Sequence, residues 1–529
     1  MSVPSGTAQP YPSAPSAAAV SPWTSRLAAA FSGVVATVAA LAAGELAAGL
    51  LPGVPSPILA VGRTLIDFQP AGAKSVFVDL FGTGDKLALQ VLILLVALAL
   101  GAGIGILGRS RPTVAISVLG AFVVAGVIAG LRDPAVSPTL AVGAGLGELA
   151  IGAWTLDRLL AAAATGAARR SGRGSMPDWS RRTLLIQGGG IAIGAVVAGA
   201  IGRTFLERQR SAPPGGLPVA ESPVSLPAGA DLSLDGLTPI VVPSPDFYRI
   251  DTALLTPNID RESWQLRIHG MVDREVTLTY AQLIALPIIE QYVTIACVSN
   301  LVGGGLVGNA KWTGVRLRDV LDMAGVKPGA TQMVGRSADG WTAGTPTAWV
   351  MDPEREPMIA IGMNGAPLPR EHGFPARVIV PGLYGYVSAT KWVTELEFTT
   401  LEAFDAYWVP LGWAKEAPIL TQSRIDVPSN GSSIPAGPTT IAGVAWAPDR
   451  GIAKVEVSLD SGDWHETTLS VPISKATWVQ WTYPWTATPG NHAVRVRATD
   501  DTGQTQTETE TRPDPSGSRG WHHILFGVG

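Results

Sequence analysis

Five apolar stretches near the N-terminus limit what this chain can fold into. They cover roughly residues 29–51, 87–107, 113–131, 139–156 and 184–202, and the fourth contains a carboxylate, Glu148. About 20 helical residues, rising about 1.5 Å each, cross a bilayer core of about 30 Å, so each stretch approaches or reaches that length. The pattern predicts an all-α membrane domain of about five helices over residues 26–205, after a disordered tail over residues 1–25.

The distribution of charge supports a division near residue 205. Only 15% of the 529 residues are charged, whereas a soluble chain carries about 25%. Residues 1–205 hold 22 of the 80 charged residues with a net charge of +6, and residues 206–529 hold 58 with a net charge of −10. The acidic second half argues against nucleic acid as a partner, because nucleic-acid binding needs clustered Lys and Arg.

Positive charges in the short connections predict which way the membrane domain points, because cytoplasmic loops carry an excess of Lys and Arg. Eight basic residues fall on the side of the N-terminus and four on the opposite side. An inside N-terminus with five spans places everything after residue 205 outside the cytoplasm, so we expect a multi-pass protein of the cytoplasmic membrane. The eight are Arg26, Arg109, Arg111, Arg169, Arg170, Arg173, Arg181 and Arg182, and the four are Arg63, Lys74, Lys86 and Arg132.

Two features of the membrane half leave alternatives open. Glu45 and Glu148 either mark a function, since intramembrane carboxylates are costly, or pair with Ser or Thr near a helix end. The run Ser180-Arg-Arg-Thr-Leu-Leu185 resembles a twin-arginine export signal, although its arginine pair is equally an ordinary positive-inside feature. The twin-arginine route moves folded proteins whose cofactors are inserted before export. Ala198-Gly-Ala200 offers a cleavage site, but we expect a retained anchor.

The scarcity of Cys and His excludes several kinds of metal site. Cys297 is the single cysteine, which excludes an intrachain disulfide, an Fe–S cluster held by the chain's own thiolates, a CxxCH haem and a cysteine-built zinc finger. The first of the six histidines is His269, so the membrane half cannot hold a bis-histidine haem.

The second half of the chain is predicted to contain a linker and two domains. Residues 206–236 are rich in proline and poor in large apolar residues, which is typical of a linker. Residues 237–420 mix short alternating strands with short helical patterns, which predicts an irregular α+β domain. Residues 421–529 show strands at regular intervals, which indicates an antiparallel immunoglobulin-like β-sandwich and a C-terminal tail. The strands expected there are 439–447, 453–459, 464–471, 478–485 and 492–498.

Cys297 stands where an apolar strand meets a glycine-rich loop. It ends Val293-Thr-Ile-Ala-Cys297 and precedes Leu301-Val-Gly-Gly-Gly305, with Asn300, Asn309 and Lys311 nearby in sequence. A lone Cys is usually a small buried hydrophobe. A thiolate beside a glycine loop and polar residues is instead suited to act as a nucleophile or a soft metal ligand. A cysteine hydrolase would also need a His partner, for which His372 is the candidate.

A second group of candidate residues lies between positions 371 and 392. His372, Arg377 and Lys391 are spaced through a segment punctuated by glycine and proline. Arg offers a planar fork and Lys a point charge, so together they are suited to bind a phosphate. The alternative is that Arg377 and Lys391 are solvated surface charges, but Arg377 opens an apolar strand.

In combination these residues resemble a known family. Cys297 with Ser299-Asn300, the glycines after it and Asn309-Ala-Lys-Trp-Thr-Gly-Val315 are similar to the molybdopterin-binding domain of the sulfite oxidase family. Met363-Asn-Gly365 and the run from His372 to Lys391 are similar to it too. The sandwich looks like the molybdenum-cofactor dimerisation domain of that family. The resemblance covers roughly residues 240–525 and leaves out the membrane half.

The resemblance implies a molybdenum–molybdopterin cofactor and a role for each matching residue. It implies that Cys297 is the catalytic sulfur ligand to molybdenum. It also implies that the reaction is a two-electron oxo transfer on a small-molecule substrate. A homodimer through the sandwich is a further implication. The cofactor-binding residues implied are Asn300, Asn309, His372, Arg377 and Lys391, and the catalytic residues besides Cys297 are Arg336 and Asp339.

The chain departs from the family pattern in ways that affect substrate and electron transfer. The arginine expected just after the cysteine is missing from Val298-Ser-Asn-Leu-Val302, and Tyr248-Arg-Ile-Asp-Thr252 replaces an expected Arg-Asn-His run. No tyrosine occurs between Trp341 and Tyr384, where the family has one. We therefore expect a substrate other than sulfite. We also expect no fused haem domain, so electrons pass to a separate cytochrome or quinone.

Three hypotheses follow from the sequence. The leading one is a membrane-anchored, extracytoplasmic molybdenum oxidoreductase. The second is a non-catalytic ligand-binding or partner-docking module derived from the same fold, which the missing arginine and tyrosine motivate. The third is a small transporter or membrane assembly with an accessory exported domain, which Glu45 and Glu148 motivate.

Overall fold

The computed structural model describes residues 22–68, 80, 85–133, 136–169, 179–208, 216–254 and 256–529. Residues 1–21 of the predicted tail and residues 209–215 of the predicted linker lie outside the described residues. The chain divides into two compact units, and the described residues up to Arg208 belong to the first and those from Gly216 to the second.

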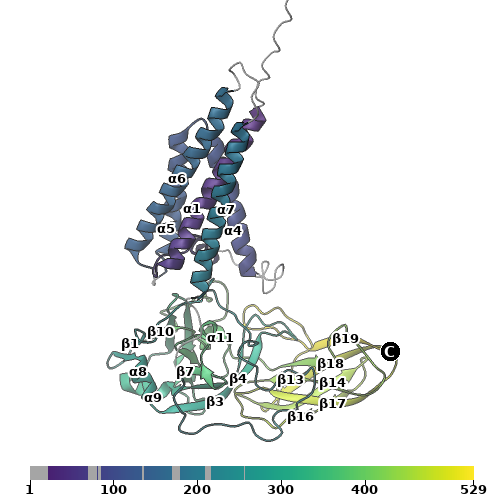
Figure 1. Cartoon of the computed structure of the whole chain (residues 1–529). Helices are drawn as coiled ribbons and strands as arrows, with labels where there is room; N and C mark the ends of the chain where they lie inside the picture. Colours follow the sequence, from purple (N-terminus) through teal and green to yellow (C-terminus); the bar gives the residue numbers. More distant parts are fainter. Residues whose placement is uncertain are drawn as a thin grey trace, which may run out of the picture. The chain divides into compact units, whose positions relative to one another are not determined.

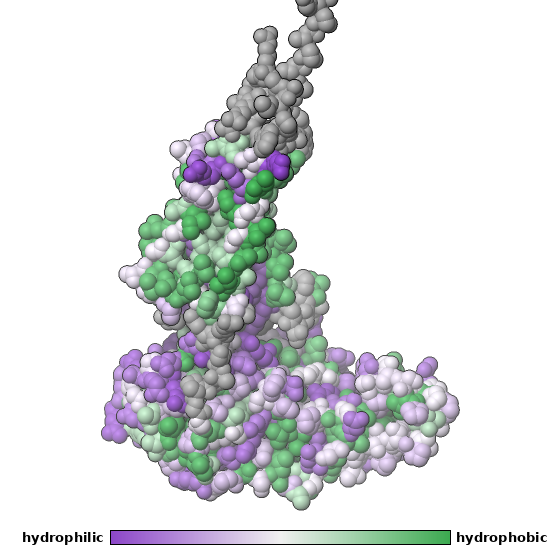
Figure 2. Space-filling model, in the orientation of Figure 1, coloured by the Kyte–Doolittle hydropathy of each residue, from purple (hydrophilic) through white to green (hydrophobic). Residues whose placement is uncertain are grey.

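In its described residues the first unit contains helices and the turns that connect them. Its described part contains five helices that are long and apolar enough to cross a membrane, over Arg26–Leu50, Lys86–Gly108, Pro112–Gly130, Pro138–Ala163 and Arg182–Leu206. These match the five predicted stretches, and Figure 2 shows a largely hydrophobic surface over them. The helices in Figure 1 are α1 (Pro22–Leu50), α2 (Pro57–Asp67), α4 (Asp85–Gly108), α5 (Pro112–Gly130), α6 (Pro138–Arg169) and α7 (Trp179–Arg208).

Glycines let helices α1 and α4 approach closely. A Cβ atom added at Gly33 on α1 would lie 2.0 Å from the carbonyl oxygen of Gly101, and one at Gly105 on α4 would lie 2.0 Å from that of Ala29. Without a hydrophobic driving force inside lipid, such close backbone packing is a main source of helix association. Larger side chains at these positions would push α1 and α4 apart.

Glu45 and Glu148, the two carboxylates predicted to lie within the membrane, are close to each other in the helical unit. One oxygen of Glu45 accepts a hydrogen bond from the Ser56 hydroxyl at 2.5 Å and a longer one from the amide of Ile58 at 3.4 Å. A Cβ atom at Gly44 would lie 2.4 Å from a carboxyl oxygen of Glu148. Glu45 therefore has the serine partner that one of the two sequence interpretations predicted.

The α+β part of the second unit, strands β1 to β10, contains one mixed sheet, in which β1 and β10 are parallel, and one antiparallel sheet. One has the order β2-β1-β10-β5-β6, and the other has the order β3-β4-β7-β8 with β9 paired to β7. The first sheet comprises β1 (Gln265–Gly270), β2 (Val276–Thr279), β5 (Gln332–Ser337), β6 (Thr342–Pro346) and β10 (Val393–Thr399). The second comprises β3 (Ile288–Ala296), β4 (Val307–Arg316), β7 (Met358–Met363), β8 (Ala366–Pro367) and β9 (Arg377–Ile379).

Short helices connect these strands. They are α8 (Tyr280–Ile284), α9 (Leu317–Ala324), α10 (Thr347–Val350), the 3₁₀ turn η2 (Arg370–His372) and α11 (Gly385–Ser388). Helix α8 begins with a capping box, in which Thr279 and Gln282 satisfy each other's backbone amides. Helix α9 ends at Gly325, whose φ of +69° suits a left-handed C-cap.

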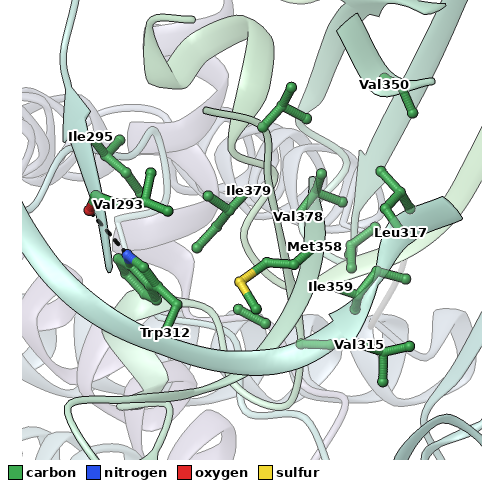
Figure 3. Packing of buried hydrophobic residues seen from close by; sticks show 14 of the residues in the cluster. Val293, Ile295, Trp312, Val315, Leu317, Val350, Met358, Ile359, Val378 and Ile379 are labelled. Carbon is green, nitrogen blue, oxygen red and sulfur yellow. Dashed lines mark hydrogen bonds between the residues drawn. The ribbon is translucent and has the colours of Figure 1, made fainter. Parts of the chain in front are cut away.

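A single apolar core lies under both sheets and supports the strands that carry the candidate site. Trp312 on β4 is fully buried, and its indole nitrogen donates to the carbonyl oxygen of Val293 on β3 at 3.2 Å (Figure 3). This bond satisfies the one polar atom of a large aromatic side chain that would otherwise be buried without a partner. Met358, Ile359 and Val378 pack in the same cluster.

Strands β11 to β19 form the sandwich, which confirms the predicted immunoglobulin-like class. Its core contains Ile441, Val457, Trp481 and Val496, all fully buried. One sheet has the order β11 (Gln422–Val427), β13 (Gly437–Trp446), β17 (Val479–Ala487), β16 (Thr468–Leu469). The other has the order β12 (Ser433–Ile434), β19 (His522–Val528), β18 (Gly490–Asp500), β14 (Ile452–Leu459), β15 (Trp464–Glu466).

One predicted strand of the sandwich is divided in the structure. The run expected over 464–471 forms two short strands, β15 and β16, which join different sheets. Thr467 lies between them, and its hydroxyl and amide both donate to the carbonyl oxygen of Val455. The chain therefore changes sheets at Thr467, which an alternating pattern alone does not reveal.

Candidate active site

Cys297 lies directly after β3, at the start of a loop that ends before β4. Its amide donates to the carbonyl oxygen of Leu306 at 2.9 Å, which continues the pairing of Ala296 with Val307. Asn300 makes two hydrogen bonds within this loop. Its side-chain oxygen accepts from the backbone amide of Leu306 at 2.7 Å, and its backbone amide donates to the carbonyl oxygen of Cys297 at 3.1 Å. The thiol is half-buried. We call residues 297–306 the cysteine loop.

Two tyrosines that the sequence did not single out lie within electrostatic reach of Cys297. Burial and the neighbouring Cys297 raise the pKa of Tyr248, and burial raises the pKa of Tyr384 to about 12. Both phenols therefore stay neutral at pH 7 and can donate a hydrogen bond toward the region of the thiol. In the sequence, Tyr248 was noted only within a run that departs from the family pattern, and the tyrosine expected between Trp341 and Tyr384 is missing.

A cluster of cations lies around the carboxylate of Asp251, and Tyr248, three residues earlier in the sequence, lies within electrostatic reach of Arg377. The Lys391 ammonium is 2.7 Å from a carboxylate oxygen of Asp251, and the Arg249 guanidinium is 3.0 Å from the same oxygen. Asp251 is only 4% exposed. Burial, together with Arg377 and Arg249, lowers the pKa of Lys391 to about 8, although Asp251 works against this shift.

His372 and Arg377 complete this cluster. Arg377 is 5% exposed, donates to the carbonyl oxygen of His372 at 3.0 Å and lies over the ring of Trp312 at 5.1 Å. Its Nε atom is buried without a hydrogen-bond partner among the described residues, as are Nε and Nη1 of Arg370 in η2. Burial lowers the pKa of Arg377 to about 10. We call Arg249, His372, Arg377 and Lys391 the cationic cradle.

The charge balance of the cationic cradle fits an anionic ligand. Burial and the neighbouring cations lower the pKa of His372 to about 4, so this histidine is neutral at pH 7. Arg249 and Lys391 then pair with the carboxylate of Asp251, and Arg377 adds a third positive charge near His372 and Lys391. A phosphate monoester carries a charge of about −1.5 to −2 at pH 7. Such a group would offset the excess charge and supply acceptors for the unpaired donor of Arg377.

The buried imidazole of His372 gives a pH dependence that can be measured. Its pKa of about 4 lies below the value of 6.5 expected in the unfolded chain, so the unfolded state binds more protons between these values. We therefore expect the cofactor-free protein to lose up to about 3 kcal/mol of stability as the pH falls from 6.5 to 4. Thermal-unfolding midpoints of the wild type and His372→Gln should diverge over this range, with the variant less sensitive to acid.

His492 provides a matched control of opposite sign. Its hydrogen bond to Asp460 raises its pKa, so its contribution to stability is fully present below pH 6.5 and is lost as the pH rises through the higher folded value. Between pH 6.5 and 4 this contribution is constant, so His492→Gln should show the same acid sensitivity as the wild type over that range and differ from it only above pH 6.5. Equal acid sensitivity in His372→Gln and the wild type would contradict a buried neutral imidazole.

Other predicted site residues make contacts within the scaffold. Asn309 is fully buried, donates to the carbonyl oxygen of Ile240 at 2.8 Å and accepts from Thr294 at 3.2 Å. Its neighbour Lys311 pairs with Glu290 at 3.0 Å. Asn309 therefore anchors β4 to the segment before the cradle. A direct contact of its amide with the cofactor stays a prediction.

The two residues predicted to be catalytic besides Cys297 do not join the cysteine loop through any described contact. The Arg336 guanidinium pairs with Glu397 at 3.1 Å through its Nε and lies over the ring of Phe404 at 5.0 Å. Asp339 is buried and accepts from the amide of Trp341 at 3.2 Å, which fixes a turn. These contacts give both residues a structural role, and their catalytic role stays a prediction.

Comparison with known proteins agrees with the geometry of the site. Residues 253–408 match the family model "Oxidoreductase molybdopterin binding domain", and residues 422–496 match the model "Bacterial Ig domain". Mitochondrial sulfite oxidase from Rattus norvegicus is 31% identical over 273 residues, which are 43% of this chain and 49% of that protein. This region is a molybdopterin-binding oxidoreductase domain of the sulfite oxidase family. The resemblance found in the sequence is thus confirmed, and so is the molybdenum–molybdopterin cofactor that it implied.

Further relatives of the molybdopterin domain carry out different reactions. Human mitochondrial sulfite oxidase is 32% identical over 265 residues, 42% of this chain and 48% of that protein. Nitrate reductase [NADH] 1 from Oryza sativa subsp. japonica is 28% identical over 272 residues, 41% of this chain and 30% of that protein. Among solved structures, the sulfane dehydrogenase SoxCD from Paracoccus pantotrophus matches with a TM-score of 0.48 and 23% identity, covering 59% of this chain and 90% of that one. The chain spans about half the length of the sulfite oxidases that it matches.

Proposed function

We propose that the chain is a membrane-anchored molybdenum oxidoreductase that transfers an oxygen atom and two electrons to or from a small substrate. When bound, the molybdenum cofactor supplies this two-electron oxo-transfer chemistry. The chain contributes Cys297 as the sulfur ligand and the cationic cradle, through Arg377 and Lys391, as the site for the cofactor's phosphate. The observation that supports the proposal is that Tyr248 lies within electrostatic reach of both Cys297 and Arg377, so we take the cysteine loop and the cationic cradle as one site.

The substrate that we propose is not sulfite. The arginine that sulfite oxidases place just after the cysteine is absent from residues 298–302. Tyr248 and Tyr384 are neutral groups near Cys297, so this side of the site offers hydrogen-bond donors rather than an extra positive charge. Neutral donors favour an uncharged oxo donor or acceptor, such as a sulfoxide or an amine oxide, over a dianion.

The cellular arrangement that we propose follows from the sequence predictions. The five helices anchor the chain in the cytoplasmic membrane, and the excess of Lys and Arg on the N-terminal side favours an extracytoplasmic location for residues 237–529. The arginine pair Arg181-Arg182, in the first turn of α7, supports export by the twin-arginine route. Electrons then pass to or from a separate cytochrome or quinone. The sandwich, residues 421–529, is a candidate interface for a homodimer.

Molybdenum content tests the proposal directly. Full-length protein, purified from a molybdate-fed host with its export route intact, should contain close to one molybdenum atom per chain. Folded, correctly exported protein without molybdenum would favour the alternative of a non-catalytic ligand-binding module. Addition of sulfite, a sulfoxide and an amine oxide to the loaded protein with a redox dye should give turnover with one of the last two. Rapid dye reduction by sulfite would contradict the proposed substrate class.

A further inference from the structure

Three side chains of the sandwich reach the cysteine loop. The Ser518 hydroxyl donates to the carbonyl oxygen of Asn300 at 2.6 Å, and the Arg424 guanidinium donates to that of Gly304 at 2.9 Å. His522 packs against Gly303, where an added Cβ atom would lie 2.1 Å from Cδ2 of the imidazole. Gly303 has a φ of +72°, so the loop needs glycine here for its backbone conformation as well as for this contact.

These side chains are themselves held in place within the sandwich. The Arg424 guanidinium pairs with Asp426 at 2.6 Å and donates to the Thr238 hydroxyl at 2.7 Å. The Nδ1 atom of His522 accepts from the amide of Ile425 at 3.0 Å. Burial beside Arg424 lowers the pKa of His522 to about 4, so the ring is neutral at pH 7, as an acceptor at Nδ1 requires.

The same segment of the sandwich also contacts Tyr384. A Cβ atom at Gly517 would lie 2.4 Å from the Tyr384 hydroxyl, and Ser518, the next residue, is 3% exposed. The carbonyl oxygen of Ser518 accepts from the Gln422 side chain at 2.8 Å, which ties the segment to strand β11. Residues 517–522 therefore lie against both the cysteine loop and a tyrosine near its thiol.

We infer that Arg424, Ser518 and His522 are positioning residues, through which the sandwich fixes the cysteine loop and the direction of the Cys297 thiol. Two hydrogen bonds connect the sandwich to Cys297. The Ser518 hydroxyl donates to the carbonyl oxygen of Asn300, and the amide of Asn300 donates to the carbonyl oxygen of Cys297. The inference rests on the proposed function in taking Cys297 as the metal's sulfur ligand. A ligand on a glycine-rich loop needs outside support, since metal sites depend on groups that orient their ligands.

Alkylation of Cys297 tests this inference in the full chain. Cys297 is the single cysteine, so a small thiol reagent such as iodoacetamide reports on this residue alone. In cofactor-free protein in detergent, Arg424→Gln should raise the alkylation rate about tenfold, because loss of a charged hydrogen bond makes local opening of the loop easier. Arg424→Lys keeps a donor for Gly304 and should give a smaller increase. Ser518→Ala removes one bond with little change of volume and should also accelerate alkylation.

Arg497→Gln is the matched control. Arg497 also forms a partly buried ion pair in the sandwich, with Glu456 at 3.0 Å, and no described contact joins it to the cysteine loop. We expect its alkylation rate to equal that of the wild type, whatever its thermal midpoint. Equal rates in Arg424→Gln, Ser518→Ala and the wild type would overturn the inference. So would an increase in Arg497→Gln as large as that in Arg424→Gln, because the effect would then reflect global stability.

A spectroscopic measurement on loaded protein separates this inference from the proposed function. If Cys297 is the sulfur ligand, Arg424→Gln should shift the Mo(V) electron paramagnetic resonance spectrum, whereas Arg497→Gln should leave it unchanged. If Arg424→Gln accelerates alkylation but does not shift the spectrum, the positioning role of Arg424 is supported. That result would count against Cys297 as the sulfur ligand. Wild-type protein without molybdenum would count against the proposed function alone, since the alkylation rates need no cofactor.

Discussion

Replacing Cys297 with serine is expected to lower oxo-transfer turnover by about a thousandfold or more, which corresponds to about 4 kcal/mol of lost transition-state stabilisation. A serine hydroxyl is a much poorer ligand than a thiolate for a metal that accepts soft donors. Molybdenum should nevertheless stay near one atom per chain, because the cationic cradle is unchanged. Turnover with a redox dye and elemental analysis of the same preparation check both halves of this prediction.

Ser299→Ala is the control for this substitution. Ser299 is half-buried on the same cysteine loop but was not predicted to bind the cofactor. Its variant should retain turnover within about twofold, as expected for a change that removes no partner of the reacting groups. Full turnover in Cys297→Ser would show that Cys297 is not the ligand. Loss of molybdenum together with turnover would instead assign Cys297 a role in holding the cofactor.

The five long apolar helices and most of the sandwich were predictable because their signals are local. An apolar run of spanning length needs no knowledge of the rest of the chain, and the five predicted stretches agree with the five helices. Strand β19, His522–Val528, was not among the predicted strands. It lies between β12 and β18, and its apolar residues Ile524, Leu525 and Phe526 are consecutive, so its sequence lacks the alternation of apolar and polar residues that predicts a strand. Its pairing depends on strands that are distant in the sequence.

The residues of the candidate site also fall into those that a local motif reveals and those that it does not. Cys297, His372, Arg377 and Lys391 were predicted because each belongs to a motif that can be read within a short segment. Asp251 was not predicted, since its partner Lys391 is 140 residues away in the sequence and only folding brings them together. Arg249 and Tyr248 are adjacent to Asp251 in the chain, so one segment supplies three of the groups that the motifs did not reveal. That segment precedes the region that matches the family model, which begins at residue 253.

Replacing Arg377 with methionine is expected to reduce the bound cofactor at least about tenfold, in line with the loss of a charged partner, while making the cofactor-free protein more stable. Arg377 is 5% exposed and its Nε atom has no described partner. The fall of its pKa to about 10 corresponds to a penalty of about 3 kcal/mol for the buried charge. Methionine keeps contact with the Trp312 ring without that charge.

Molybdenum content and the thermal midpoint of the cofactor-free protein should therefore change in opposite directions for Arg377→Met. Arg497→Met is the control, because Arg497 has a carboxylate partner in Glu456 and its removal should lower the midpoint without changing molybdenum content. A lower midpoint with unchanged molybdenum in Arg377→Met would show that this arginine serves the scaffold. The expected opposite changes would show that the chain keeps a buried charge with no carboxylate partner among the described residues because that charge binds an anion, since a charge retained for stability alone would be paired with a carboxylate.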